Sequence, residues 1–268
     1  PDDPPDLIVS SGPHSLTPLR YLARHFRCPS VFVQGTVRVP PGAVTAILRP
    51  EDEPGRDDII ELPLLLTDIT PEKLTVARED FLAPLVVSPP PSLRALLVGA
   101  SSGKINFTTD DWTALGTLVR QSWERDRIPW AIASSYRTGT ETEQLLRDLI
   151  PPEALFEAVW YSETPRPVAS AFFALASEVY VTFDSLTMIT EAICSGTPSA
   201  LIQPAGFTPN PRDSHHRYLQ SLLERRFTTC HVLGSTDRLS PHPAPAPVDY
   251  QPAMNLLRKR IGWAHNTD

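Results

Sequence analysis

The chain has 268 residues, enough for one large domain or two of ordinary size, and its net charge of −7 argues against nucleic acid as a partner. Its three cysteines, odd in number and far apart in sequence, exclude a disulfide framework or a zinc cluster and indicate a reducing compartment. No apolar run approaches the roughly 18 residues of a membrane span and no secretory signal opens the chain, so we expect a soluble, cytoplasmic protein.

The first third of the chain predicts a strand-helix-strand unit followed by further strands. The expected elements are strands at 6–10, 30–34, 45–48 and 59–62 and a helix at 16–25. Gly12 and Pro13 form the turn that ends the first strand, which would place His14 at the carboxyl edge of the sheet. A neutral imidazole there suits proton removal near pH 7, although a lone histidine is more often a hydrogen-bonded structural residue. We therefore regard His14 as a candidate general base.

Prolines divide the chain. There are 30 of them against 12 glycines, and they cluster in short runs that predict stiff connectors. One run, 88–92, lies between two segments of alternating strands and helices, so we expect a domain boundary at 89–91. A later run, 240–252, should be extended and lead into a last helix at 253–264. The predicted organisation is an N-terminal domain over 1–88, a C-terminal domain over 93–239 and a terminal segment over 240–268.

After the boundary, strands and helices alternate regularly. The expected strands are 93–99, 129–134, 158–161, 178–182 and 199–203, and the expected helices are 110–125, 141–149, 168–177, 213–225 and one that begins at 185. Such alternation is typical of a doubly wound parallel sheet. The predicted fold class is therefore α/β, with two Rossmann-like domains that face each other across a cleft.

Ligands of open parallel sheets bind at the carboxyl ends of the strands, so the loops there are the candidate site. The loop after the strand at 93–99 offers Gly99, Ser101 and Ser102, whose backbone and hydroxyl groups could bond a phosphate, although its glycine spacing is not that of a P-loop. Arg137 follows the next strand and could pair with a phosphate, and Arg166 lies in a similar position one loop later. For both, a plain surface arginine is the commoner case.

The stretch 181–198 passes directly from a strand into a helix. Ser185 can cap that helix, and its first free N–H groups, at the strand's carboxyl end, attract phosphate. Thr187 adds a hydroxyl in the first turn, and Glu191 lies one turn beyond on the same side, where a carboxylate can accept two hydrogen bonds from a ribose diol. A glutamate on a helix surface is usually only solvated, but these neighbours favour a ligand contact.

The sequence contains no pattern that predicts a metal or a bound cofactor. His215 and His216 with Asp213 begin a predicted helix, but adjacent histidines point in different directions and make a poor metal pair. A G-x-G-x-x-G turn and a D-x-D pair do not occur. We expect neither a metal nor a cofactor.

The run from Thr182 to Pro198 resembles the motif T-x-D-S-x-S-M-x-x-E-A-x-x-T-G-x-P of a family named for a plant mitochondrial fission protein. Many bacterial members of that family are described as glycosyltransferases of the GT-B fold. Weaker matches extend over most of the chain, at 5–9, 11–12, 70–72, 97–99, 135 and 137–138. The first domain also resembles that of the peptidoglycan N-acetylglucosaminyltransferase, where a similar strand-helix-strand unit handles the acceptor.

The resemblance implies roles for several residues. In GT-B transferases a glutamate at the position of Glu191 commonly binds the ribose of a nucleotide-sugar donor. The helix N-terminus at Ser185, Thr187 and Met188, with the loop at Gly99 and Ser101, would hold the diphosphate. Asp184, in the same motif, is the second candidate for the catalytic base after His14.

This chain departs from the family pattern at several points. It has Gly99-Ala100-Ser101-Ser102 where G-G-P-S is usual, Tyr136 where an arginine is usual, and His14 where a basic residue is common. The strand and helix that open the family's first domain lack a counterpart, and the first residue is Pro1 rather than methionine, so we expect the chain shown to be trimmed at its N-terminus.

The sequence thus predicts an enzyme, a metal-independent glycosyltransferase whose C-terminal domain binds a nucleotide-activated sugar as substrate. Its acceptor would be a sugar, lipid or protein, and we allow for peripheral association with a membrane. Two alternatives stay open. One is a nucleotide-sugar epimerase or hydrolase on the same scaffold, and the other is a non-catalytic adaptor of the mitochondrial-fission type.

Overall fold

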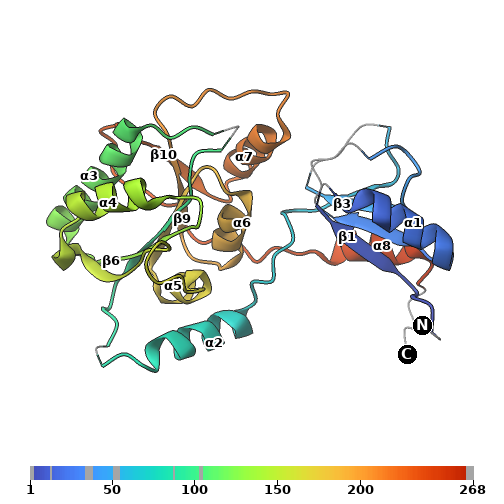
Figure 1. The fold of residues 1–268 in the computed structure, drawn as a ribbon, viewed down its shortest axis with the longest axis horizontal. Helices are drawn as coiled ribbons and strands as arrows, with labels where there is room; N and C mark the ends of the chain where they lie inside the picture. The colour runs from blue at the N-terminus through green and yellow to red at the C-terminus, as the bar shows by residue number, and fades with distance from the viewer. Residues whose placement is uncertain are drawn as a thin grey trace. The chain divides into compact units, whose positions relative to one another are not determined.

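The computed structural model describes residues 3–12, 14–33, 39–50, 55–86, 88–102 and 105–263 (Figure 1). The chain forms two compact units. The first comprises Pro1–Leu66 together with Val248–Asp268, and the second comprises Thr67–Pro247. Each unit contains its own parallel sheet, as the alternation of strands and helices predicts. Within the described residues, no helix combines the length and apolar character needed to cross a bilayer.

The first unit is built on a four-stranded parallel sheet in the order β1-β2-β3-β4. Its strands are β1 (Ile8–Ser11), β2 (Ser30–Val33), β3 (Ala46–Arg49) and β4 (Ile59–Glu61). Helix α1 (Leu16–Phe26) connects β1 to β2, and Leu19 packs with Phe32, Ile47 and Ile59 in one apolar cluster. All four residues of β2 are buried, because both faces of the strand are covered.

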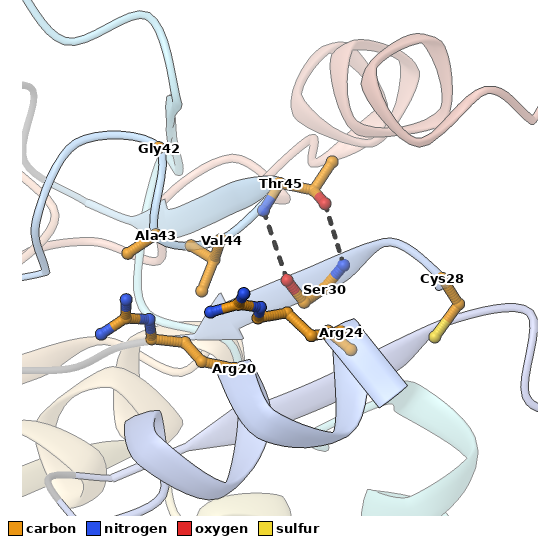
Figure 2. Close-up of a pocket in the computed structure, with 9 residues that line it drawn as sticks. Arg20, Arg24, Cys28, Ser30, Gly42, Ala43, Val44 and Thr45 are labelled. Carbon is orange, nitrogen blue, oxygen red and sulfur yellow. Dashed lines mark hydrogen bonds between the residues drawn. The ribbon is translucent and has the colours of Figure 1, made fainter. Parts of the chain in front are cut away.

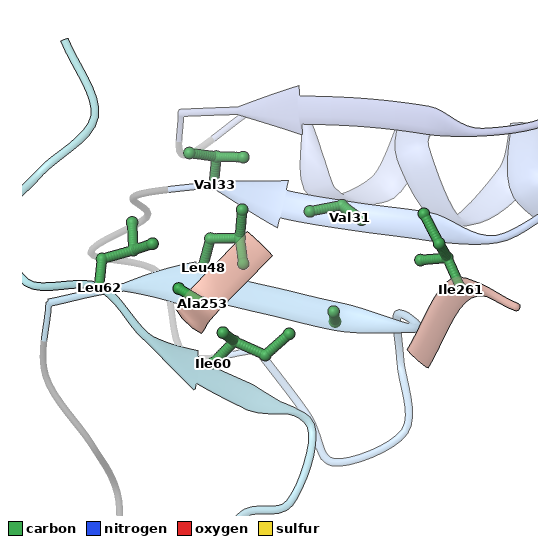
Figure 3. Close-up of a cluster of buried hydrophobic side chains, with 8 residues drawn as sticks. Val31, Val33, Leu48, Ile60, Leu62, Ala253 and Ile261 are labelled. Atoms are coloured by element: carbon green, nitrogen blue, oxygen red, sulfur yellow. The ribbon is translucent and has the colours of Figure 1, made fainter. Parts of the chain in front are cut away.

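The other face of this sheet is covered by the last helix of the chain, α8 (Gln251–Ile261). Its residues Ala253 and Ile261 lie against side chains of the central strands and of the segment after β4 (Figure 3). The Tyr250 hydroxyl donates to the Leu65 carbonyl at 3.0 Å, which ties the start of α8 to the chain after β4. The C-terminal helix therefore completes the N-terminal unit, a link between residues about 200 positions apart that no local pattern predicts.

The second unit has a six-stranded parallel sheet in the order β10-β9-β8-β5-β6-β7. Its strands are β5 (Arg94–Val98), β6 (Trp130–Ser134), β7 (Leu155–Val159), β8 (Glu178–Thr182), β9 (Ser199–Gln203) and β10 (Thr229–Val232). The chain first builds outward from β5 through β6 to β7 and then returns to the other side of β5 with β8, β9 and β10. This is the doubly wound order, and it puts a topological switch point between β5 and β8, where ligands of such sheets bind.

Helices connect these strands. They are α3 (Thr109–Asp126), α4 (Thr140–Leu149), α5 (Ala169–Leu175), α6 (Leu186–Cys194) and α7 (Ser214–Glu224), with a short 3-10 turn at Pro152–Ala154. Helix α3 begins with a capping box in which Thr108 and Asp111 satisfy each other's backbone N–H groups. Helices α3 and α4 pack closely at Gly116, where an added Cβ would lie 2.8 Å from the Leu149 Cβ.

The division of the chain differs from the expected one because of a helix that the sequence pattern does not predict. Helix α2 (Pro71–Leu82) starts at the N-cap Thr70, whose hydroxyl accepts from the Lys73 N–H. It packs on α5, with the Phe81 and Phe172 rings at 5.5 Å, and so belongs to the second unit (Figure 1). The proline run at 89–91 lies inside that unit, between α2 and β5, and the chain passes from one unit to the other near Leu66.

Other differences are smaller. Strand β7 begins three residues before the expected 158–161, and β10 was not expected at all. The segment after β10 has little regular structure apart from an antiparallel bridge between Ser199 and His242. The expected ends at Gln34 and Ala264 lie outside the described residues.

Candidate functional site

Side chains at the switch point form a connected network. The Thr182 hydroxyl, at the end of β8, accepts from the Gly99 N–H at 2.7 Å and donates to Asp184 Oδ1 at 2.7 Å. Asp184 Oδ2 accepts from the Ala100 N–H at 3.1 Å and from Arg137 at 2.8 Å. We call these five residues, Gly99, Ala100, Arg137, Thr182 and Asp184, the Asp184 network. It brings the loops after β5, β6 and β8 to one place.

Gly99 is required by the position of the Asp184 carboxylate. A Cβ added at residue 99 would lie 2.2 Å from Asp184 Oδ1 and 2.4 Å from Oδ2. No real side chain tolerates such contacts, so the absence of a Cβ is what lets the backbone of the β5 loop approach the carboxylate. The missing Cβ makes room for a carboxylate of the protein, and the predicted contact of Gly99 with a ligand stays a prediction.

The β6 loop is fixed by Thr138. Its hydroxyl accepts from the Ser135 N–H at 2.9 Å and contacts the carbonyl oxygens of Val98 at 2.9 Å and Gly99 at 2.8 Å. Thr138 therefore ties the β6 loop to the end of β5 and holds the neighbouring Arg137 beside Asp184. The Asp184 side chain is fully buried, while that of Arg137 remains 32% exposed. One face of the guanidinium thus stays open, with N–H groups beyond the one that Asp184 uses.

Helix α6 begins next to this network. Ser185 caps it by accepting from the Met188 N–H at 3.4 Å, as its sequence position predicts. Thr187 is exposed in the first turn and Met188 is half-buried. Among the described residues, the free N–H groups of this turn and the open face of Arg137 are donors available to an anion at the switch point.

Glu191 lies in the second turn of α6 and is half-buried. Its carboxylate makes no hydrogen bond to any residue that the structure describes. Burial, and secondarily the charge of Asp68, raises the pKa of this carboxyl above its ordinary value. Partial burial of a carboxylate that accepts no hydrogen bond costs desolvation free energy. A ligand hydroxyl that donates to its oxygens would offset that cost.

The serines of the β5 loop serve the loop itself. The Ser101 hydroxyl donates to the Phe107 carbonyl at 2.9 Å and accepts from the Phe107 N–H at 2.8 Å. Ser102 bonds Ile105 through both its hydroxyl, at 3.1 Å, and its N–H, at 2.6 Å. These contacts close the loop on itself, with Gly103 and Lys104 outside the described residues.

The remaining candidates lie elsewhere. Arg166 does not join the network: it pairs with Glu157 at 2.5 Å on the surface beside β7. His14 is exposed and follows β1 in the first unit, at the carboxyl edge of that sheet. His216 is buried, accepts from the Asn210 N–H at 2.8 Å and packs on Phe207, so it has a structural role. Within the described residues, no three His, Cys, Asp or Glu side chains come together as metal ligands.

The sequence reading missed two aromatic residues at the same edge. Tyr136 is 71% exposed and Tyr161 is 45% exposed, and their rings lie 6.2 Å apart, edge to face. The buried Glu143 braces the chain beneath them by accepting from Ser134 at 2.6 Å and from Ser162. Their position in the sequence could have indicated them, since both tyrosines follow strands of the parallel sheet as Arg137 does.

Comparison with solved structures agrees with this architecture. Heptosyltransferase II of E. coli, an ADP-heptose enzyme of lipopolysaccharide, is 12% identical with a TM-score of 0.50 over 96% of this chain and 76% of that one. The S. aureus MnaA structure with UDP is 9% identical with a TM-score of 0.50 over 97% of this chain and 77% of that one. No curated protein sequence matches this chain.

The two parallel-sheet units and these neighbours define a protein of the GT-B glycosyltransferase fold. The model of the family described as Mitochondrial fission ELM1 matches residues 1–252. The chain belongs to that family, which confirms the resemblance carried by the run from Thr182 to Pro198.

Proposed function

We propose that this protein is a metal-independent glycosyltransferase whose second unit binds a nucleotide-activated sugar. The observation that carries the proposal is the Glu191 carboxylate, half-buried and without a hydrogen-bond partner among the described residues, one turn beyond the start of α6 at the switch point. A ribose offers two adjacent hydroxyl donors that match two carboxylate oxygens. The UDP in the neighbouring S. aureus structure is consistent with such a ligand.

The diphosphate of the donor would lie between the first turn of α6 and the open face of Arg137. The backbone N–H groups of α6 and the positive end of its dipole attract a phosphate. Arg137 keeps donors available while Asp184 fixes its position, and preorganised donors of this kind stabilise a leaving group without a metal ion. We give Asp184 this positioning role rather than that of base, because its carboxylate is buried and already accepts from three donors.

The exposed tyrosines at the ends of β6 and β7 would contact the base. Tyr136 lies directly beside Arg137 in sequence, so the aromatic surface and the phosphate contact come from one loop. A planar base can stack on such a surface at a gain of about 1–3 kcal/mol.

The reaction joins an acceptor hydroxyl oxygen to the anomeric carbon of the sugar while the bond from that carbon to the diphosphate breaks. The electron pair of that bond leaves with the diphosphate, and the hydroxyl proton passes to a base. We assign the base to His14, because it is exposed and follows the first strand of the first unit at the carboxyl edge of its sheet.

The test is a thermal-shift screen against nucleoside diphosphates and nucleotide sugars, followed by calorimetric titration of the best ligand. Glu191→Gln should weaken its binding by about 1–3 kcal/mol, the range for loss of a charge-assisted acceptor, without lowering the melting temperature. The matched control is Glu124→Gln, because Glu124 is an exposed glutamate on α3 of the same unit and should leave affinity unchanged. Failure of every nucleotide to bind would overturn the proposal and favour an adaptor.

A second measurement separates transfer from related chemistry. Release of the free nucleotide only when an acceptor is added supports a transferase. Release in water alone, or interconversion of the donor sugar, would contradict transfer and assign hydrolysis or epimerisation.

A further inference from the structure

One segment of the first unit carries several arginines and no acidic residue. Residues 7–50 contain five arginines and no Asp, Glu or Lys, although the whole chain has a net charge of −7. Two of them, Arg20 and Arg24, are exposed on α1 one helical turn apart. Like charges at this spacing repel and destabilise a helix slightly, and a bound anion would relieve that repulsion.

Both arginines line a pocket with a volume of about 520 Å³. Its other walls come from the residues before and at the starts of β2 and β3, including Cys28, Ser30 and the loop from Gly42 to Thr45 (Figure 2). In Figure 2 the two arginine side chains extend along α1 on the side that faces Ala43 and Val44. Because β2 and β3 are parallel, the pocket lies at the amino edge of the sheet, opposite the carboxyl edge where His14 lies.

The side chains that line the pocket offer donors. Ser30 and Thr45 are linked in both directions. The Ser30 N–H donates to the Thr45 hydroxyl at 3.0 Å, and the Thr45 N–H donates to the Ser30 carbonyl at 2.9 Å and approaches the Ser30 hydroxyl at 3.4 Å. Each hydroxyl thus accepts from the partner's backbone and keeps its own proton to donate. Two guanidinium groups and two hydroxyls belong to the polar lining, which among the described residues includes no carboxylate.

One carboxylate that touches the pocket wall, that of Asp58, is already paired with an arginine outside the pocket. Asp58 accepts from the Gly42 N–H at 3.3 Å and forms a bidentate pair with Arg56 at 2.7 and 2.8 Å. The hydrogen bond from Arg56 holds the pKa of Asp58 below its ordinary value, so the carboxylate stays ionised and stays with Arg56. Asp58 therefore fixes the glycine loop and is engaged by Arg56, and among the described residues no carboxylate is paired with Arg20 or Arg24.

A purely structural role accounts for only part of this arrangement. Arg24 lies in the last turn of α1, where a cation is favourable beside the carbonyl ends of the helix. Arg20 lies one turn earlier and gains less from that effect. The hydroxyl pair at the opposite wall is independent of the helix altogether.

We propose that this pocket is an anion site that binds a phosphate group, as a free ion or as part of a phosphorylated molecule or lipid headgroup. A phosphate presents several acceptor oxygens, which match guanidinium and hydroxyl donors converging from two walls. The site is separate from the donor site of the second unit and does not depend on the proposed transferase activity.

The experiment is an NMR titration of the full chain with inorganic phosphate, read at the backbone amides of Ser30, Gly42 and Thr45. Phosphate should shift these signals saturably, and the affinity should fall with added NaCl. Because the readout is local, phosphate bound at Arg137 in the second unit does not obscure it. Absence of a saturable shift at these amides with both phosphate and pyrophosphate would overturn the proposal, unless the lipid arm below locates binding at the same residues.

Two double variants separate the pocket from general charge. Arg20→Gln with Arg24→Gln should lower the affinity at least about tenfold, the equivalent of one charge-assisted hydrogen bond. Lys259→Gln with Arg260→Gln removes the same charge from exposed positions of α8 in the same unit and should change it less than twofold. Equal losses in both double variants would show a diffuse electrostatic effect and refute a defined site.

A lipid arm identifies the source of the phosphate. The chain is sedimented with vesicles of phosphatidylglycerol and, as a control, of phosphatidylcholine. Cosedimentation with the anionic vesicles alone, lost in the pocket variant and kept in the α8 variant, assigns the site to a headgroup. Saturable binding of phosphate without cosedimentation assigns it to a soluble phosphorylated ligand.

Discussion

Replacing Gly99 by alanine should dismantle the Asp184 network. The new methyl carbon would lie 2.2 Å from Asp184 Oδ1, whereas real Cβ atoms stay at least 3.0 Å from such neighbours, so the carboxylate would have to move by about 0.8 Å. Asp184 cannot make that shift and keep its bonds of 2.7 to 3.1 Å to Thr182, Ala100 and Arg137. The fully buried carboxylate would lose part of its hydrogen bonding, and a buried acceptor left unsatisfied typically costs about 1–3 kcal/mol.

The assay is urea unfolding of the wild-type chain and the Gly99→Ala variant, monitored by tryptophan fluorescence. Gly206→Ala is the matched control, because a Cβ at residue 206 meets no atom within 4 Å and the residue lies in the same unit. The control should stay within about 1 kcal/mol of wild type. A loss below about 1 kcal/mol for Gly99→Ala would refute the reasoning, since it would mean that the carboxylate moves freely.

Four further predictions concern the proposed reaction and the stability of the second unit. Turnover should survive EDTA, since protein groups stabilise the leaving diphosphate; activity lost on chelation and restored by Mg²⁺ or Mn²⁺ would contradict the mechanism. His14→Ala should lower turnover at least about tenfold with donor affinity intact, and a smaller loss would remove His14 as the base. Donor affinity should fall with decreasing pH as Glu191, whose pKa burial raises, takes up a proton, and the Glu191→Gln variant should lack this dependence. Hydrogen bonding from Arg125, and then from Arg94, lowers the pKa of Asp126 from 3.8 to about 2. The contribution of this carboxylate to stability is therefore present above about pH 4 and lost as the pH falls towards 2. The unfolding free energies of wild type and Asp126→Asn should converge over this range, and a constant difference would contradict the prediction.

The local features of this protein could be read from its sequence. Apolar runs with turn residues between them predict each central strand, and Ser185 predicts the start of α6 through capping alone. Few topologies are compatible with short strands that alternate with helices. The alternation therefore predicts the α/β class and places the loops of the candidate site at the carboxyl edge of the sheet. The motif from Thr182 to Pro198 carried the family, because it lies on one continuous segment.

The tertiary structure decided which residues meet. Arg137 and Asp184 are 47 positions apart, and their pairing depends on the return of β8 to the side of β5. The sequence offers Arg137 and Ser101 as phosphate contacts, and only the fold shows that Arg137 is held by Asp184 and that Ser101 bonds Phe107. Helix α2 packs on the second unit through Phe81. This is the one buried residue of the helix, so the sequence of α2 does not show which unit it packs against. Local energies fix what a segment becomes, whereas contacts between distant segments depend on the whole chain being folded, and those contacts define both the switch-point site and the arginine pocket.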